Sequence, residues 1–137
     1  MAYKYALAPM IAWFMAGTLK FMINYIRFRK EAVTLIGNGG FPSTHTTVMS
    51  TTVFLIGFGE GWGSPIFGLG IAVLMITIID ALGIRRAVGK HASAINRYIF
   101  PGNTTIPLLR ERQGHTPIEV LGGLALGVTL AFVLNQI

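Results

Sequence analysis

The sequence predicts an all-α integral membrane protein, a helical bundle with about four transmembrane helices and one basic interfacial helix. Hydrophobic residues make up 53% of its 137 residues and charged residues only 12%, whereas a soluble domain carries about 25% charged residues. The mean hydropathy is +0.62, which excludes a disordered chain. A chain of this length forms one domain, which we expect to cover residues 1–137.

Four segments are apolar enough to cross a membrane, which takes about 20 mostly apolar residues. They cover residues 5–26, 46–59, 64–83 and 116–137. The second segment is short, and it reaches the required length only if its helix begins near Ser43. The first segment has a long apolar stretch with Lys20 inside it and no clear cleavage site after it. We therefore expect a retained helix there and not a signal peptide.

Residues 84–100, between the third and fourth spans, are predicted to form a basic amphipathic helix. Its apolar side chains recur at helical spacing on one face, at Ile84, Ala87, Val88, Ala92, Ile95 and Ile99. Basic and small polar residues fill the opposite face. A basic amphipathic helix next to a span usually lies in the headgroup layer, and we expect that orientation here. A loop with prolines and a glycine follows over residues 101–107.

The basic residues gather at one end of the predicted bundle. Four spans place nine lysines and arginines on the side that holds residues 27–45 and 85–115, and only Lys4 on the other side. The positive-inside rule makes the basic side cytoplasmic, so we expect an inner or plasma membrane protein whose site faces the cytoplasm. The net charge of +6 suits anionic headgroups or substrates. A nucleic-acid ligand is not expected, because the basic residues form no soluble basic face.

Three charged residues lie inside the predicted spans, namely Lys20, Asp80 and Glu119. An unpaired charge is unfavourable in lipid, so such residues usually face the bundle interior and form pairs. All three lie at a similar depth near the basic end, which predicts a functional site there. The alternatives are an ion pair of Asp80 with Lys20 or Arg86 that only fixes packing, and a Lys20 side chain that snorkels to the headgroups.

Two histidines stand next to predicted helix starts at this same end. The first closes the run Gly39-Gly40-Phe41-Pro42-Ser43-Thr44-His45. Glycines allow a tight backbone close to a ligand, and the free N–H groups of a first helical turn can hold an anion. The alternative is a plain loop with a capped helix, for which Pro42 and Ser43 also suffice.

The second histidine, His115, stands in the run Gly114-His115-Thr116-Pro117-Ile118-Glu119. Thr116 and Glu119 match a capping box with Pro117 in the first turn, which explains Glu119 as a structural residue. Alternatively, Glu119 orients His115, which lies four residues before it. From the sequence, these two interpretations compete.

Together these residues favour phosphate chemistry. No cluster has an obvious metal-ligand spacing, so we expect neither a metal nor a cofactor. Many cations around one site suit a phosphate or a diphosphate. One histidine can attack phosphorus as a nucleophile, and a second can protonate the leaving oxygen.

These motifs resemble those of the type 2 phosphatidic acid phosphatase superfamily. They are most similar to its divergent branch, membrane proteins related to acid phosphatases and vanadium-dependent haloperoxidases. That branch carries G-G-M-P-S-S-H, D-A-x-G-V-R-R-A-x-G and G-H-T-P-x-E-V, and this chain matches them in order at residues 39–45, 80–89 and 114–120. Lys20 and Arg27 give the K-x6-R of the wider superfamily, and Glu119 stands in place of its aspartate.

The resemblance implies a transmembrane phosphatase-like domain, a metal-independent enzyme that hydrolyses a lipid phosphate or diphosphate. It implies that His115 forms a phosphohistidine, that Glu119 orients His115, and that His45 protonates the leaving group. The implied phosphate-binding residues are Lys20, Arg27, Ser43, Thr44 and either Arg85 or Arg86, with Asp80, Gly39 and Gly40 in structural or tuning roles. Candidate substrates are phosphatidylglycerophosphate, phosphatidic acid and prenyl diphosphates.

The sequence leaves two other functions open. One is a non-catalytic membrane protein that binds anionic lipids or acts as a scaffold. The other is a small transporter or proton relay, although no second inverted half is visible. The pair Gly123 and Gly127 is typical of close helix contacts, either inside the bundle, which we favour, or across a homodimer, which we also predict.

Overall fold

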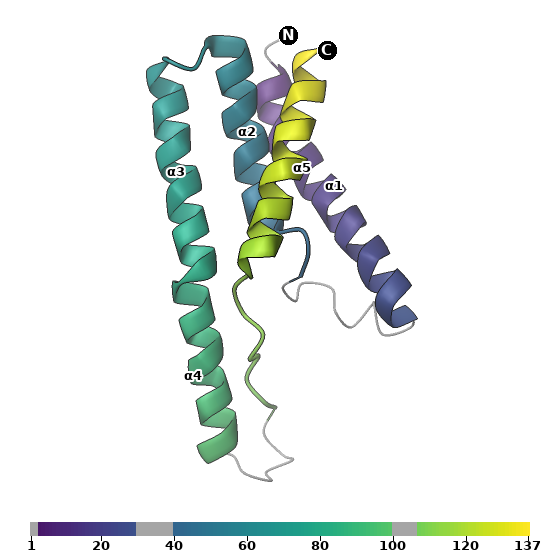
Figure 1. Cartoon of the computed structure of the whole chain (residues 1–137), viewed down its shortest axis with the longest axis vertical. Helices are drawn as coiled ribbons and strands as arrows, with labels where there is room; N and C mark the ends of the chain where they lie inside the picture. Colours follow the sequence, from purple (N-terminus) through teal and green to yellow (C-terminus); the bar gives the residue numbers. More distant parts are fainter. Residues whose placement is uncertain (1–2, 30–39, 100–106) are drawn as a thin grey trace.

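The computed structural model describes residues 3–29, 40–99 and 107–137. These residues form helices and no strands, which confirms the all-α fold (Figure 1). The helices follow in the order α1 (Tyr3–Phe28), α2 (Thr44–Glu60), α3 (Pro65–Leu82), α4 (Ile84–Tyr98) and α5 (Pro117–Asn135). The chain alternates direction along the bundle, so both of its ends lie at the same end of the molecule.

Three helices begin at a capping side chain. Ser43, Ser64 and Thr116 precede α2, α3 and α5, and each side-chain oxygen accepts a hydrogen bond from an N–H of the first turn. Pro65 and Pro117 occupy the first positions of their helices, where a missing N–H is harmless. The helix starts therefore lie where the sequence supplies a cap.

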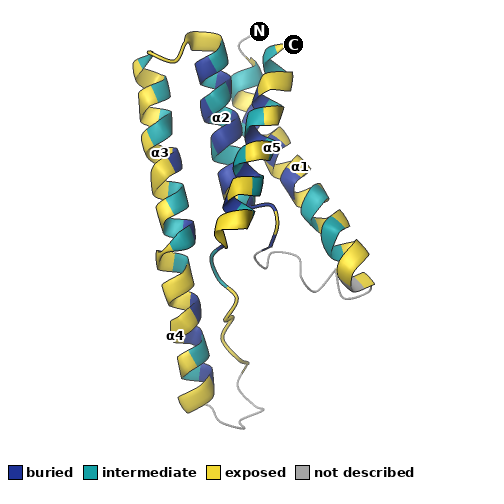
Figure 2. Ribbon diagram, in the orientation of Figure 1, coloured by how far each residue is buried: buried dark blue, intermediate teal, exposed yellow. Residues whose placement is uncertain are grey.

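Helix α2 is the centre of the bundle. It packs most extensively against α5, and also against α1 and α3, and Figure 2 shows the buried residues concentrated on it. Its first two turns bury small polar side chains, with Thr46, Thr47, Ser50 and Thr51 fully buried, and Val53 and Leu55 are buried further along. The hydroxyl groups form hydrogen bonds close by in the chain, such as that from Ser50 to the Thr46 carbonyl (2.6 Å). These bonds allow the polar groups to be buried.

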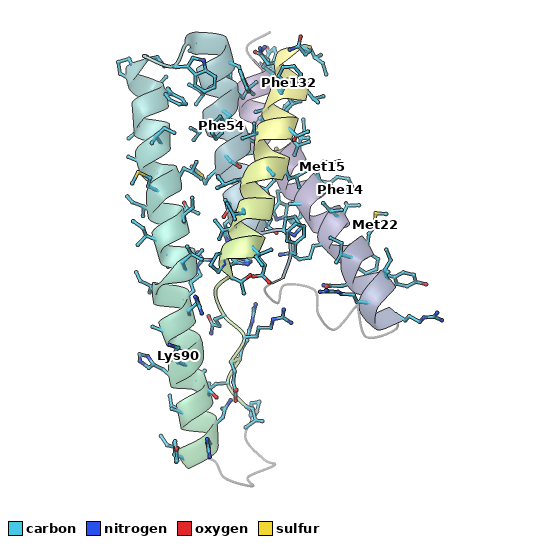
Figure 3. The ribbon with its side chains drawn as sticks, in the orientation of Figure 1. Phe14, Met15, Met22, Phe54, Lys90 and Phe132 are labelled. Atoms are coloured by element: carbon cyan, nitrogen blue, oxygen red, sulfur yellow. The ribbon has the colours of Figure 1, made fainter. Side chains whose placement is uncertain are left out.

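In the described part of the chain, three helical segments are long and apolar enough to cross a membrane: Tyr3–Arg27, Pro65–Tyr98 and Pro117–Asn135. The remaining predicted span is α2, whose 17 residues extend about 25 Å, slightly less than the ~30 Å of a hydrocarbon core. Because α2 is surrounded by α1, α3 and α5, its polar side chains face other helices and not lipid. The outer helices carry exposed apolar side chains, such as Phe14 and Met22 on α1 (Figure 3). The molecule is a helical membrane bundle.

Glycines bring α5 into close contact with α2. A methyl group at Gly123 would lie 2.7 Å from the Ser43 carbonyl oxygen, and one at Gly127 would overlap the Ser50 hydroxyl group. That hydroxyl donates to the Gly123 carbonyl oxygen at 3.3 Å. Of the two roles considered for Gly123 and Gly127, the structure shows packing inside the bundle.

Helix α4 is present as predicted, but its direction differs from the expected one. It continues α3 past Gly83 as one rod and does not lie across the end of the bundle (Figure 1). Helical hydrogen bonds run through the junction, from Gly83 N to the Ile79 carbonyl (2.9 Å) and from Ala87 N to the Gly83 carbonyl (3.0 Å). The helix therefore continues from α3 into α4 without a sharp change of direction.

The buried face of α4 shares only Ala92 with the predicted apolar face. Gly89, Ala92 and Asn96 are buried, whereas Ile84 and Val88 are 64% and 44% exposed. Residues 107–115 run along α4 and contact these small residues (Figure 1). Hydropathy does not reveal this contact, because it depends on small size and hydrogen bonding.

We expect Gly127→Ala to destabilise the bundle, because the added methyl group would overlap the Ser50 hydroxyl and lie 2.9 Å from the Thr47 carbonyl oxygen. Overpacking of this kind costs about 1–3 kcal/mol, and thermal unfolding in detergent should show a lower midpoint. Gly17→Ala is the matched control, since no atom lies within 4 Å of a methyl group there and alanine favours a helix. Equal midpoints for the two variants would contradict tight packing of α2 on α5.

Candidate functional site

Most of the predicted site residues that the structure describes lie at the end of the bundle where α2 and α5 begin and α3 passes into α4. They come from separate segments, with Lys20 on α1, His45 in the first turn of α2, Asp80 and Arg85 beside the α3–α4 junction, and His115 just before α5. Long-range packing is therefore required to assemble the site, because these residues lie far apart in the sequence.

Two hydrogen bonds join α1, α2 and α5 at this end. The Lys20 ammonium group donates to the Thr44 hydroxyl at 3.2 Å. The backbone N–H of Ser43 donates to the Glu119 carbonyl at 2.9 Å, which ties the starts of α2 and α5 together. Lys20 is also within electrostatic range of both site histidines. Its charge therefore acts on the whole site.

The carboxylate of Glu119 holds the His115 ring. His115 Nδ1 lies 3.1 Å from Glu119 Oε2, and the same oxygen accepts the Thr116 N–H at 2.9 Å. The Thr116 hydroxyl in turn accepts the Glu119 N–H at 3.3 Å. The capping box and the orientation of His115 therefore coexist, although they appeared as competing interpretations in the sequence. One carboxylate begins α5 and fixes the histidine.

The environment of His115 keeps its imidazole neutral. Its side chain is only 7% exposed, and this burial lowers the pKa of His115, with a further lowering by the charges of Lys20 and Arg85. Glu119 acts in the opposite direction and does not cancel the effect. Because an unfolded histidine titrates near a pKa of about 6.5, His115 stabilises the fold above that pH, and the contribution is lost as the pH falls toward its folded pKa.

The backbone around His115 is fixed by the α3–α4 junction. Its N–H donates to the Ala81 carbonyl at 3.0 Å. The preceding residue, Gly114, has a φ of 77°, which favours glycine. A methyl group at Gly114 would also lie 2.8 Å from the Ala81 carbonyl oxygen and 2.7 Å from Arg86 Cγ. Glycine is thus required here on two grounds, and His115 is held from both sides.

Arg85 links the second histidine to the rod of α3 and α4. Its Nε pairs with the Asp80 carboxylate, and its Nη1 lies 3.4 Å from His45 Nδ1. The partner of Asp80 is therefore Arg85, and not Lys20 or Arg86 as considered from the sequence. Arg86 is exposed, and its aliphatic stem contacts Gly114. Of the two adjacent arginines, Arg85 is the one beside a site histidine.

The two histidines have partners of opposite hydrogen-bonding character. A carboxylate only accepts, so His115 donates through Nδ1 and leaves a lone pair on Nε2. A guanidinium group only donates, so the neutral His45 accepts through Nδ1 and carries its proton on Nε2. The Nε2 of His115 therefore has a free lone pair, whereas the Nε2 of neutral His45 carries a hydrogen.

Ser43 has a structural role as a helix cap, and the phosphate-binding role that the resemblance implies for it stays a prediction. Its side chain is fully buried, and its oxygen accepts from the Thr46 N–H (3.4 Å) and the Thr46 hydroxyl (2.9 Å). It therefore caps α2. Thr44, which is only partly buried, remains beside Lys20.

The other predicted site residues are distributed differently. Arg27 is exposed in the last turn of α1 and takes part in none of the hydrogen bonds described above. Gly40 is buried with a φ of 119°, in keeping with the tight backbone expected before α2. Gly39 lies outside the described residues.

Several contributing residues were absent from the sequence prediction. Ala81 acts through its carbonyl group, which leaves no signal in the side-chain pattern. Gly89 and Asn96 face residues 107–115. The spacing of Gly89, Ala92 and Asn96 at i, i+3 and i+7 places them on one helix face, and this small-residue stripe was the available signal.

The site is best suited to an anion. Lys20 and Arg85 supply positive charge, and the first turn of α2 adds N–H groups that have no partner within the helix. In residues 3–29, 40–99 and 107–137, no group of three or more histidine, aspartate or glutamate side chains is placed to hold a metal ion. Phosphate is an anion whose oxygens suit such donors.

Comparison with known proteins places the chain among membrane proteins of this kind. The family model described as "Divergent PAP2 family" matches residues 1–130. The chain belongs to the divergent PAP2 family. This membership confirms the resemblance seen in the sequence motifs.

A relative of this divergent PAP2 protein is the uncharacterized membrane protein YuiD of Bacillus subtilis (strain 168). The two are 29% identical over 144 residues, which cover 93% of this chain and 91% of the relative. No solved structure matches the chain. The relative and the apolar helices together identify this divergent PAP2 protein as a membrane protein.

We expect Glu119→Gln to lower the pKa of His115 further, because the carboxylate is the group that raises it against burial and the nearby cations. An NMR titration of the imidazole signals would measure this change. Thr116→Val is the matched control. It removes the capping hydroxyl at a cost of about 1 kcal/mol in stability but leaves Glu119 on His115, so the pKa should not move. An unchanged pKa in Glu119→Gln would show that this carboxylate does not control the charge of His115.

Proposed function

We propose that this divergent PAP2 protein is a membrane phosphatase that hydrolyses a lipid phosphate or diphosphate through a phosphohistidine at His115. The observation that carries the proposal is the pairing of the two histidines with opposite partners, Glu119 and Arg85. Glu119 leaves the Nε2 lone pair of His115 free to act as a nucleophile, and His45 is a second imidazole at the same site that can act as an acid when protonated and as a base when neutral.

In the first step, Nε2 of His115 attacks the phosphorus atom. The N–P bond forms as the bond to the leaving oxygen breaks, and His45, in its imidazolium form, donates its Nε2 proton to that oxygen and becomes neutral. The lipid alcohol or phosphate then leaves. Glu119 stabilises the positive charge that His115 acquires, because it already holds Nδ1–H.

In the second step, water replaces the histidine on phosphorus. His45 is now a neutral imidazole, so its Nε2 accepts a proton from the attacking water and the imidazolium is restored. The N–P bond breaks, inorganic phosphate leaves, and both histidines return to their starting protonation states. The cycle needs no further reactant.

The charge on the transferring group is balanced by fixed cations. Lys20 is held beside Thr44 at the start of α2, and Arg85 is held by Asp80. Preorganised donors stabilise developing negative charge without reorganising during the reaction. The N–H groups at the start of α2 add a positive helix terminus at the same place.

The membrane helices favour a lipid substrate. The exposed apolar faces of the outer helices support a substrate whose headgroup reaches the site while its acyl or prenyl chain stays in the bilayer. Phosphatidylglycerophosphate, phosphatidic acid and prenyl diphosphates all present a phosphate in this way. The nine basic residues at the site end favour the cytoplasmic face.

The direct test is phosphate release from these lipids by the purified protein in detergent, with a chelator present. We expect release by the wild type and its loss, by roughly a thousandfold or more, in His115→Asn, because the nucleophile is removed. His91→Asn is the matched control, since His91 is exposed on α4 and should retain activity. A phosphorylated intermediate that is stable in alkali and labile in acid should form only when His115 is present.

The result that overturns the proposal is equally clear. Folded wild-type protein that releases no phosphate from any of these lipids, or a His115→Asn variant as active as His91→Asn, would remove the phosphatase assignment. Headgroup binding that survives both substitutions would then favour a protein that binds anionic lipids without turnover.

The proposed orientation is tested by cysteine labelling, because the natural chain has no cysteine. We expect an impermeant thiol reagent applied to intact cells to label Gln136→Cys, beyond α5, and to leave His91→Cys on α4 unlabelled. Permeabilised cells provide the control, in which both positions should react. Labelling of His91→Cys alone in intact cells would place the site on the outer face.

A further inference from the structure

Phe41 is a partly exposed aromatic residue at the site end of the bundle. It lies directly before Pro42 and Ser43, which lead into α2. Phe41 is 38% exposed, whereas Pro42 is fully buried. The proposed reaction uses neither this ring nor any other apolar group. The contacts of the ring indicate what it does there.

The glycine at position 122 makes room for the Phe41 ring on α5. The three atoms nearest to a methyl group at Gly122 all belong to the Phe41 ring, which the methyl group would overlap. Gly122 lies three residues beyond Glu119, which is about one helical turn. Two residues after Phe41, the Ser43 N–H donates to the Glu119 carbonyl at 2.9 Å. The ring is therefore fixed about one turn along α5 from the carboxylate that holds His115.

The ring lies on the membrane side of the phosphate site. Helix α5 begins at the site and is long and apolar enough to cross the bilayer, so Gly122 lies deeper in the membrane than Glu119. Ile118 and Leu121 on the same part of α5 are 71% and 63% exposed. Ile118 shares a helix face with Gly122, which lies four residues further on. An apolar surface thus begins next to the charged groups and continues toward the bilayer.

Helix α1 leaves this apolar surface uncovered. Its buried residues are small and recur at every fourth position, at Ala8, Ala12 and Ala16. Residues 17–27 include no buried residue, and Figure 1 shows this part of α1 diverging from α5 toward the site end. Lys20 nevertheless donates to the Thr44 hydroxyl at 3.2 Å. The charge of Lys20 therefore stays at the site, although the helix that carries it does not pack over the start of α5.

These groups match a ligand that is anionic at one end and apolar at the other. Lys20 and Arg85 supply the positive charge for a phosphate, and the Phe41 ring offers an apolar surface about one helical turn further into the membrane. A lipid with its phosphate at His115 extends its chain in the direction of α5, because that direction leads into the hydrocarbon core. The carbon atoms nearest the phosphate then pass the level of Phe41.

We propose that Phe41 is a specificity-determining residue, whose ring on Gly122 contacts the lipid chain next to the phosphate and makes the site prefer a lipid phosphate to a water-soluble phosphate ester. This inference rests on the proposed function. The cations and histidines of the site act on the phosphate group, which both classes of substrate share. An apolar contact beside the phosphate is what separates the two classes.

The first experiment compares hydrolysis of phosphatidic acid and of glycerophosphate by the full chain in detergent micelles. We expect Phe41→Ala to lower kcat/KM for phosphatidic acid about tenfold, as for the loss of apolar contact with one or two methylene groups. The value for glycerophosphate should change by less than about twofold, and Phe41→Leu should keep most of the preference. Phe132→Ala is the matched control, because it removes an exposed ring with an edge contact near the other end of α5.

A second pair of variants tests the seat of the ring on α5. Gly122→Ala should displace the ring, because the methyl group would overlap it, and should lower the preference for phosphatidic acid as Phe41→Ala does. The methyl group fits once the ring is gone, so the double variant should lose less thermal stability than the two single variants together. A merely structural role of Phe41 would lower the rates with both substrates by the same factor.

A binding experiment separates this assignment from the proposed function. The natural chain has no cysteine, so Phe41→Cys and the control Phe132→Cys each carry a single thiol, combined here with His115→Asn to prevent turnover. We expect phosphatidic acid to slow the alkylation of Phe41→Cys by N-ethylmaleimide. Inorganic phosphate, and phosphatidylcholine with the same chains, should not slow it. The thiol of Phe132→Cys should react equally fast in all cases.

Each outcome bears on one assignment. Equal losses with both substrates in Phe41→Ala, or equal protection of Phe41→Cys by phosphatidic acid and by either control ligand, overturns the role of Phe41. Hydrolysis of phosphatidic acid by the wild type without protection of Phe41→Cys overturns that role alone. Protection without any release of phosphate by the wild type overturns the proposed function and leaves Phe41 as a residue that contacts lipid. The absence of both protection and release overturns both assignments.

Discussion

The close contact between α2 and α5 is the constraint on which the site depends. Gly123 and Gly127 allow the two helices to approach, and the bond from Ser43 N to the Glu119 carbonyl aligns their first turns. His45 follows one of these starts and His115 precedes the other. The separation of the two histidines is therefore set by helix packing, which is far stiffer than a pair of loops. Both helices also direct their positive ends toward the same place.

The rod formed by α3 and α4 provides a second frame around these histidines. Its Ala81 carbonyl holds the backbone of His115, and its Arg85 contacts the ring of His45. Because the helix continues through Gly83, these two attachments have a fixed separation. Asp80 adds to this rigidity by restraining Arg85. Each histidine is thus held by the helix start next to it and by the rod of α3 and α4.

Local signals in the sequence predicted much of this molecule. Short-range patterns predicted the caps at Ser43 and Thr116, the pairing of Glu119 with His115, and the apolar spans. Each of these features depends on residues that lie close together in the sequence. The direction of α4 did not follow, because hydropathy reports which face is apolar and not which face a neighbouring segment covers. The partner of Asp80 and the burial of Ser43 were also missed, since both depend on how helices rotate against one another. The difference between Arg85 and Arg86 has the same origin, as adjacent helical residues point about 100° apart.

The arrangement of the two chain ends has a consequence for duplicated forms of this protein. The start of α1 and the end of α5 lie at the same end of the bundle, opposite the site (Figure 1). A tandem gene fusion would therefore join the copies through a short linker on that face. Both halves would insert with the same orientation, and both reactive ends would open toward the same compartment. Such a fusion would give a parallel repeat, in which both copies have the same orientation. An inverted repeat would require an additional membrane crossing between the copies.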